Sequence, residues 1–266
     1  MGKIIFFDMD GTILYHDEVT GFPVISPRLR MTLKKVQERG HKIFIATGRP
    51  YAFLSKDVLD LGFDGYVLTN GACVLYHDQM IYHSPMNISH ITPLVQEFEK
   101  RKIEYVLQHE KYTYLREFSG NLQKFYDRCS INQDLIIKDF DEREKLEETC
   151  KIEAMPVGEE NIEFCENVNP KFFNSMGCPP YTFEIYASNV SKATGILKVL
   201  ELLNIDVKES YAFGDGKNDI EMFQTVNVAI AMGNANDEVK AYANMVCLPV
   251  DQDGVAKKLE ELFLSN

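Results

Sequence analysis

The sequence predicts an α/β protein in which a parallel-sheet core, with helices on both faces, is interrupted by an α+β insert. The first observation is the apolar run at residues 4–7, which ends at Asp8 and Asp10. Such a run is typical of a buried parallel strand whose carboxyl end carries the polar residues. The second is that apolar runs followed by glycine-containing polar loops recur at 42–48 and 210–219. The third is that the middle of the chain lacks this pattern, so we expect a core of 1–83 and 189–266 and an insert of 84–188.

Turn and cap residues divide the core into elements. Ser26 followed by Pro27 predicts the start of a helix, because serine caps helices and proline suits their first position. This helix is expected to end near Gly40. The other expected core elements are strands at 66–68, 73–76, 80–82 and 226–231, and helices at 51–61, 192–203, 218–224 and 255–264.

The insert reads as helices and a mostly antiparallel sheet. Pro85 and residues 187–189 are its expected hinges. The expected elements are helices at 89–102, 118–129 and 161–176, a hairpin of strands 104–108 and 112–116, and strands at 151–155 and 182–187.

Composition narrows the classes of partner. The 266 residues are 45% hydrophobic and carry a net charge of −12 from 28 basic and 40 acidic residues. This balance argues against nucleic acid and anionic membranes, which bind through Lys and Arg. The six cysteines form no C-x-x-C pair, and the six histidines show no metal-binding spacing. We expect a reduced, soluble, cytoplasmic protein without a signal peptide or membrane span.

Asp8 and Asp10 are the first candidates for chemistry. Two carboxylates so close together repel each other unless a cation or a proton compensates them. Gly11 allows the chain to turn tightly after them. A carboxylate in this position can attack phosphorus, and a second one can protonate the leaving oxygen and then accept a proton from water. The alternative is an ordinary strand-to-turn junction, where Asp is common.

The loop 214–219 supplies two more carboxylates, Asp215 and Asp219. With no Cys or His nearby, its oxygen donors suit Mg²⁺. The third glycine of a dinucleotide fingerprint is absent, and Lys217 is followed by Asn218 rather than by the Ser or Thr of a P-loop. Thr47 and Gly48 offer a hydroxyl and a backbone N–H to a phosphate oxygen, although an ordinary strand-to-helix loop would look the same.

Four segments together resemble the motifs of the haloacid dehalogenase-like hydrolase superfamily, in the family's order. They are Asp8-Met9-Asp10-Gly11-Thr12, residues 44–49, Ser191-Lys192 and residues 213–219. Asn70-Gly71-Ala72, residues 231–235 and residues 253–255 resemble the Cof-type branch, subfamily IIB. The resemblance implies a Rossmann-like core and an inserted C2-type cap that covers the site and helps to select the substrate.

The resemblance implies a Mg²⁺-dependent phosphatase that acts on small phosphorylated metabolites, such as sugar phosphates, through an aspartyl-phosphate. It makes Asp8 the nucleophile and Asp10 the acid and base, and it pairs Lys192 with the nucleophile and the bound phosphate. Its remaining assignments are phosphate binding by Met9, Thr47, Gly48, Lys192 and Asn218, substrate binding by Arg49, Asn70 and Gly71, and metal binding by Asp8, Asp10, Asp215 and Asp219. Whether Asp219 contacts the metal directly is left open.

Two other functions fit the same pattern. A phosphosugar mutase would pass the phosphate to a second sugar hydroxyl, and a non-catalytic sensor would bind a phosphorylated metabolite without turnover. The presence of every motif carboxylate favours the enzyme. The identity of the phosphate ester and the choice between a monomer and a homodimer do not follow from the sequence.

Overall fold

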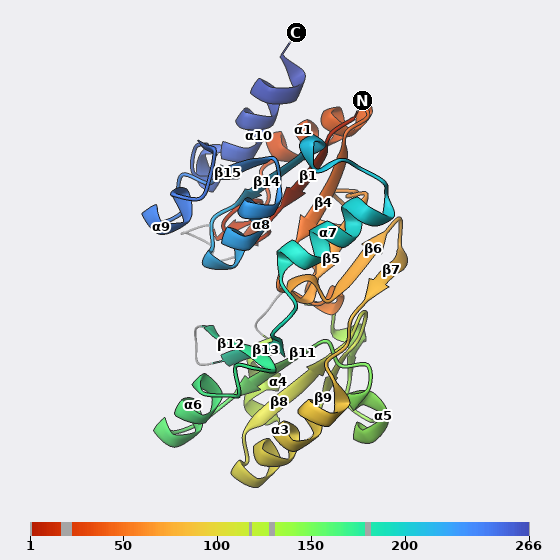
Figure 1. Cartoon of the computed structure of the whole chain (residues 1–266), viewed down its shortest axis with the longest axis vertical. Helices are drawn as coiled ribbons and strands as arrows, with labels where there is room; N and C mark the ends of the chain where they lie inside the picture. Colours follow the sequence, from red (N-terminus) through yellow and green to blue (C-terminus); the bar gives the residue numbers. More distant parts are fainter. Residues whose placement is uncertain (1, 17–22, 117–118, 128–130, 179–181, 266) are drawn as a thin grey trace. The chain divides into compact units, whose positions relative to one another are not determined.

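The computed structural model describes residues 2–16, 23–116, 119–127, 131–178 and 182–265. The chain divides into two compact units, each with its own sheet (Figure 1). The first contains residues 1–48, 56–82 and 191–266, and the second contains residues 49–55 and 83–190. Residues 49–55 therefore group with the second unit, although they lie in a range expected for the core. No helix of the described residues is both long and apolar enough to cross a membrane.

The first unit contains an eight-stranded sheet in the order β16-β15-β14-β1-β4-β5-β6-β7. The strands from β16 to β5 are parallel, and β6 runs antiparallel to β5. The bounds are β1 (Ile4–Phe7), β4 (Lys42–Ala46), β5 (Gly65–Leu68), β6 (Cys73–Tyr76), β7 (Gln79–His83), β14 (Ser210–Gly214), β15 (Val228–Ala231) and β16 (Met245–Val246). A separate two-stranded sheet pairs β2 (Tyr15–His16) with β3 (Pro23–Val24).

Helices cover both faces of this sheet, which confirms the predicted fold class. On one face, alternate residues such as Ile4 and Phe6 pack against Ile196 of α7 and Met222 of α8. On the other face, α1 contacts β4 and α10, and the ring of Phe263 lies 5.0 Å from that of Tyr211 in β14. The helices of the unit are α1 (Pro27–Glu38), α2 (Lys56–Leu59), α7 (Lys192–Leu202), α8 (Ile220–Thr225), α9 (Asp237–Lys240) and α10 (Gly254–Leu259), which continues as a π-helical turn at Glu260–Leu264.

The second unit is an α+β structure with a six-stranded sheet in the order β10-β9-β8-β11-β13-β12. All of its pairings are antiparallel except that of β10 with β9. Its strands are β8 (Glu104–Gln108), β9 (Thr113–Leu115), β10 (Ile136–Ile137), β11 (Lys151–Met155), β12 (Phe173–Cys178) and β13 (Thr182–Ala187). Its helices are α3 (Ile88–Arg101), α4 (Gly120–Tyr126), α5 (Glu142–Leu146) and α6 (Glu159–Glu166).

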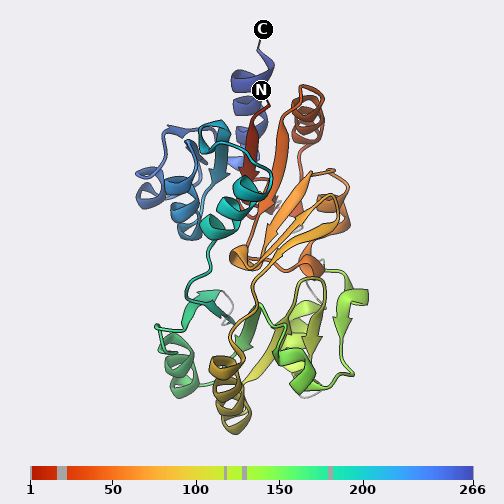
Figure 2. The ribbon, with the colours of Figure 1, turned by 45° about the vertical axis from the view of Figure 1, so that its right-hand side comes forward.

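The two faces of this second sheet differ. One face forms an apolar core with α3 and α6, which lie next to each other in Figures 1 and 2. On the opposite face, Leu122 and Tyr126 of α4 pack against Val106 and Leu115. The antiparallel insert expected from the sequence is thus present.

Three expected helices differ from the structure. The helix over 51–61 is instead a 3₁₀ turn at Tyr51–Phe53 and the short α2, because Phe53 packs against Tyr126 of the second unit while α2 belongs to the first. The helix over 161–176 ends at Glu166, and residues 173–178 form strand β12 after a turn that contains Pro170. The helix over 118–129 is α4, and both ends of that predicted range lie outside the described residues.

Candidate active site

The carboxyl ends of β1, β4 and β14 bring the predicted motifs together. Phe7 pairs with Ile45 on one side and with Phe213 on the other, so the residues after these three positions emerge at one edge of the sheet. The backbone N–H of Asp8 donates to the carbonyl of Phe213 (2.9 Å), which carries the strand pairing to the first carboxylate. Asp8 is buried and Asp10 is exposed.

Gly11 is required where the first loop meets the loop after β14. Its φ is +78°, and a Cβ at this position would lie 2.2 Å from Oδ2 of Asp215. Any side chain here would displace that carboxylate, so the glycine of the first motif allows the two acidic loops to approach each other.

Lys192 joins two of the carboxylates. Its Nζ donates to Oδ1 of Asp8 and, at 2.7 Å, to Oδ1 of Asp219. Lys192 and Asp219 are 1% and 0% exposed, so these ion pairs are shielded from water. A buried lysine of this kind requires partners of opposite charge, because desolvating an unpaired ammonium is costly.

Glycines and a capping box place the lysine. Ser191 caps α7, because its Oγ accepts from the N–H of Thr194 (3.4 Å) and its own N–H donates to Oγ1 of Thr194 (3.0 Å). A Cβ on Gly71 would lie 2.0 Å from the carbonyl oxygen of Ser191, and one on Gly195 would lie 2.5 Å from Cγ1 of Val67. The first turn of α7 can therefore reach the strand ends only because these two residues have no side chain.

Asp219 is held on both oxygens. Its Oδ1 accepts from Lys192, and its Oδ2 accepts from the backbone N–H groups of Asp215 and Gly216, each at 3.0 Å. A metal ion in direct contact with Asp219 would compete with these three donors.

Asp215 is held by two neighbouring side chains. The hydroxyl of Thr12 donates to its Oδ1 (3.3 Å), and Nδ2 of Asn234 donates to its Oδ2 (3.2 Å). Thr12 and Asn234 stand inside two of the family motifs, at residues 8–12 and 231–235, but their role beside Asp215 was not predicted from the sequence. The contacts of Thr12 with Asp215 and of Asn234 with Gly11 join residues more than 200 positions apart, so they can be seen only in the folded chain.

The cluster carries more negative charge than it compensates. Burial, and then the charge of Asp219, raises the pKa of Asp8 well above its usual range, although Lys192 acts in the opposite direction. Burial, and then Asp219, also raises the pKa of Asp215 to about 6. Burial lowers the pKa of Lys192, but the carboxylates of Asp219 and Asp8 raise it more, so the net shift is upward.

The donors fit a hard divalent cation. One carboxylate oxygen from each of Asp8, Asp215 and Asp219 lies within 4.8 Å of the others. Oxygen donors of this charge are those that Mg²⁺ prefers, and a cation would relieve the repulsion that adds to burial in raising the carboxylate pKa values.

The other predicted residues fall into three groups. Thr47 and Gly48 follow the end of β4, with Thr47 2% exposed and Gly48 partly exposed. Asn218 is also partly exposed, and its Oδ1 lies 2.6 Å from the position that a Cβ on Gly216 would occupy. Met9, Asn70 and Gly71 are buried in the first unit, where the N–H of Asn70 donates to the carbonyl of Thr47 (3.1 Å). Arg49 belongs to the second unit, and its guanidinium donates there to the carbonyl of Phe53 (3.2 Å).

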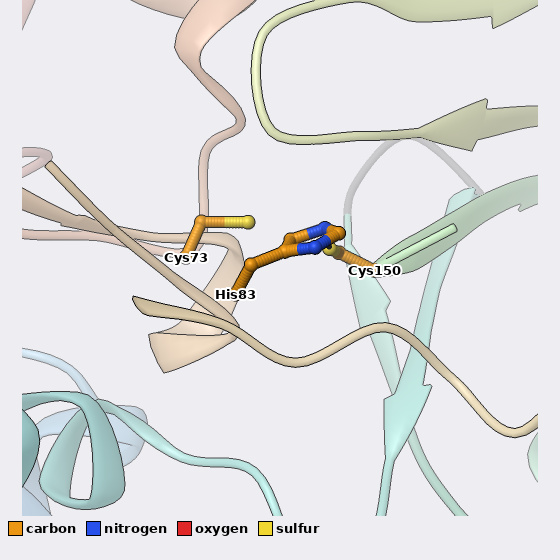
Figure 3. A group of neighbouring side chains, drawn as sticks. All are labelled: Cys73, His83 and Cys150. Carbon is orange, nitrogen blue, oxygen red and sulfur yellow. Dashed lines mark hydrogen bonds between the residues drawn. The ribbon is translucent and has the colours of Figure 1, made fainter. Parts of the chain in front are cut away.

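One cysteine–histidine contact was not foreseen. In the second unit Sγ of Cys150 lies 3.1 Å from Nε2 of His83, and Figure 3 shows these two side chains directed toward each other. The two residues are 67 positions apart in the chain, so no spacing pattern in the sequence marks the pair.

Comparisons with known proteins identify the family of this chain. A family model described as haloacid dehalogenase-like hydrolase matches residues 5–259. The chain is 33% identical to a Bacillus subtilis (strain 168) protein named "Putative phosphatase YkrA", over 98% of each chain. It is 26% identical to the B. subtilis 5-amino-6-(5-phospho-D-ribitylamino)uracil phosphatase YitU, over 98% of this chain and 97% of that protein.

A solved structure is similar over nearly the whole chain. The structure described as that of the HAD subclass IIB sugar phosphatase BT4131 has a TM-score of 0.80 and 28% sequence identity, and it covers 97% of this chain and 98% of its own. With the family model matching all but the ends of the sequence, this chain belongs to the haloacid dehalogenase-like hydrolases and is an enzyme of that class.

Proposed function

We propose that this protein is a Mg²⁺-dependent phosphatase that hydrolyses small phosphorylated metabolites through an aspartyl-phosphate on Asp8. The observation that carries the proposal is the buried Asp8, which is bound by Lys192 and lies within 4.8 Å of Asp215 and Asp219 at the carboxyl edge of the parallel sheet. The names of the relatives support phosphate-ester hydrolysis rather than another reaction of the family.

Mg²⁺ would be held by the carboxylates of Asp8 and Asp215 and by the backbone carbonyl of Asp10. When bound, it would neutralise charge on the phosphoryl oxygens, an effect generally worth several kcal/mol in the transition state. Because both oxygens of Asp219 accept hydrogen bonds, we assign Asp219 the role of orienting Lys192 and the loop after β14.

Asp8 forms the new bond to phosphorus. Lys192 binds Oδ1, so we assign the attack to Oδ2. As the Oδ2–phosphorus bond forms, the bond from phosphorus to the ester oxygen breaks. The ammonium of Lys192 is proposed to lie between the Asp8 carboxylate and the bound phosphate, where its positive charge offsets the repulsion between these two anions.

Asp10 handles the protons. It is exposed while Asp8 is buried, so a leaving group and then a water molecule can reach it. Asp10 donates a proton to the departing alcohol oxygen and afterwards takes one from water. That water attacks phosphorus, the bond to Asp8 breaks, and phosphate is released. Thr47, Gly48, Asn218 and the backbone at Met9 are proposed to bind the phosphate oxygens.

The second unit is proposed to act as a C2-type cap. Its antiparallel sheet is inserted between the second and third motifs, at residues 83–190. A cap of this kind would exclude water and contact the non-phosphate part of the substrate. Arg49, Asn70 and Gly71 are proposed to bind the substrate.

The test is phosphate release from a panel of small phosphate esters, with and without Mg²⁺, for the wild type and for Asp8→Asn. Asp60→Asn is the matched control, because Asp60 is an aspartate of the same unit paired with Lys56 at the surface. We expect Mg²⁺-dependent release that Asp8→Asn abolishes and Asp60→Asn leaves unchanged. Near-normal turnover by Asp8→Asn would contradict the mechanism, and a hexose bisphosphate or isomerised hexose phosphate as product would indicate a mutase.

A further inference from the structure

The side chain of Asn234 connects three separate segments around Asp215. Its Nδ2 donates to the carbonyl oxygen of Gly11 (2.9 Å) and to Oδ2 of Asp215 (3.2 Å). Its Oδ1 accepts from the backbone N–H of Val250 (3.0 Å). One amide thus joins the loop after β1, the loop after β14 and the turn that precedes α10.

These contacts fix which way the amide points. The N–H of Val250 can only donate, so it requires the oxygen of the amide, and the carbonyl of Gly11 can only accept, so it requires the nitrogen. Aspartate would present an acceptor to both Gly11 and Asp215, and a shorter hydroxyl could not reach all three segments. Asparagine is therefore the side chain that satisfies every partner here.

The segments that flank Asn234 hold it in place. A Cβ on Gly233 would lie 2.6 Å from the ring of Pro249, and one on Gly254 would lie 1.8 Å from the carbonyl oxygen of Leu248. The ammonium of Lys240 also donates to the carbonyl of Gly233 (2.8 Å). Gly233 lets the turn at 248–254 lie directly against the loop that carries Asn234, and Gly254 lets that turn close on itself.

We propose that Asn234 is a positioning residue that holds the Asp215 carboxylate and the Gly11 loop in the orientation that binds Mg²⁺. Thr12 holds Oδ1 of Asp215 and Asn234 holds Oδ2, so the plane of the carboxylate is fixed from both sides. Hydrogen-bond partners of metal ligands commonly contribute about 10- to 100-fold to metal affinity. The inference rests on the proposed function, because it assumes that Asp215 is a Mg²⁺ ligand.

The test measures Mg²⁺ binding without substrate, by isothermal titration calorimetry on the metal-free full chain. The variants are Asn234→Ala and Asn234→Ser, and the matched control is Asn244→Ala. Asn244 is also exposed and lies on the same C-terminal part of the chain, where its Oδ1 accepts from the N–H of Ala229 (2.7 Å). The control thus loses a similar hydrogen bond away from Asp215.

We expect the Mg²⁺ dissociation constant to rise at least about tenfold in both Asn234 variants and to stay within about twofold of wild type in Asn244→Ala. At saturating Mg²⁺ the kcat of the Asn234 variants should recover most of the wild-type value. Thr12→Val should also weaken Mg²⁺ binding, and the double variant Thr12→Val/Asn234→Ser should depart from additivity, since both side chains act on one carboxylate.

The outcomes separate the two proposals. If the wild type binds no Mg²⁺, the proposed metal dependence fails. If the wild type binds Mg²⁺ and a folded Asn234 variant binds it equally well, the metal site stands and the role of Asn234 is refuted. A fall in thermal stability alone, matched by Asn244→Ala, would reduce Asn234 to a structural residue and would also overturn the inference.

Discussion

Replacing Asp215 with asparagine should change the stability of the metal-free protein in a pH-dependent way. Burial, and then the charge of Asp219, raises the pKa of Asp215 from 3.8 to about 6. At about 1.4 kcal/mol per pKa unit, its ionisation would cost the folded state about 3 kcal/mol. The carboxyl is partly exposed, so solvent screening reduces this cost to about 2 kcal/mol.

Whether stability rises or falls with pH depends on whether the folded or the unfolded state binds the proton of Asp215 more tightly. Because the pKa of Asp215 is higher in the folded protein, the folded state keeps its proton between pH 4 and pH 6 while the unfolded chain loses it. The contribution of this group to stability is therefore fully present below pH 4 and is lost as the pH rises through 6. Asparagine does not ionise, so the variant lacks this loss.

Asp215→Asn also removes the hydrogen bond that Asn234 donates, which costs about 1 kcal/mol at every pH. The variant should be less stable than wild type by about 1 kcal/mol at pH 4 and more stable by about 1 kcal/mol at pH 8. Both proteins contain the same other titrating groups, so the change of about 2 kcal/mol in their difference isolates Asp215.

Urea unfolding followed by circular dichroism, in the presence of a chelator, measures this difference at each pH. A stability difference that does not vary between pH 4 and pH 8 would refute the electrostatic reasoning. Adding Mg²⁺ at pH 8 provides a second check, because it should stabilise the wild type by mass action and stabilise Asp215→Asn much less.

Two further predictions concern residues away from the carboxylates. Burial lowers the pKa of His109 to about 4, so stability that is present above pH 6.5 should be lost as the pH falls toward 4, by about 3 kcal/mol. Comparing the urea midpoints of wild type and His109→Gln at pH 7 and pH 4.5 checks this; equal pH dependence would contradict it. Gly71→Ala should cost at least about 2 kcal/mol and lower kcat, because its Cβ would meet Ser191 at a φ of +100°. The control is Gly120→Ala, whose added Cβ would have no atom within 4 Å, and urea unfolding and phosphate-release assays compare the two variants.

The sequence predicted the parts of the fold that depend on local patterns. Apolar runs followed by glycine and acids placed β1, β4 and β14, and the Ser26-Pro27 and Ser191-Lys192 pairs placed the starts of α1 and α7. Such signals depend on residues that are neighbours in the chain, so they can be read without knowing the contacts between distant segments.

Patterns failed where packing between distant segments decides the structure. Residues 161–176 look helical along their whole length, but β13 offers residues 173–178 a strand partner, and Pro170 stands between the two elements. Residues 51–61 look like one helix, but residues 51–55 belong to the second unit, where Ala52 and Phe53 join an apolar core, and residues 56–61 belong to the first. Neither partner is visible from the local sequence.

The site shows the same division. The sequence predicts the carboxylates and Lys192 as candidate site residues because their motifs are short and contiguous, and the structure brings Asp8, Asp215, Asp219 and Lys192 together. The contacts of Asn234 with Gly11 and of Thr12 with Asp215 connect residues more than 200 positions apart, and each arises only when the sheet aligns the ends of β1 and β14. Thr12 and Asn234 could be recognised as motif residues in the sequence, but their hydrogen-bond partners could be found only in the fold.

Charge balance explains why these residues occur together. Asp8, Asp215 and Asp219 carry three negative charges when ionised and Lys192 carries one positive charge, so two negative charges remain in a largely buried cluster. Burial, and then the charge of Asp219, raises the pKa values of Asp8 and Asp215, so part of each upward shift reflects this excess of negative charge. A divalent cation would balance it, whereas a monovalent one would leave one charge. Because a carboxylate must lose its proton to bind a metal ion, we expect Mg²⁺ to bind the cluster more tightly as the pH rises through about 6 and Asp215 ionises.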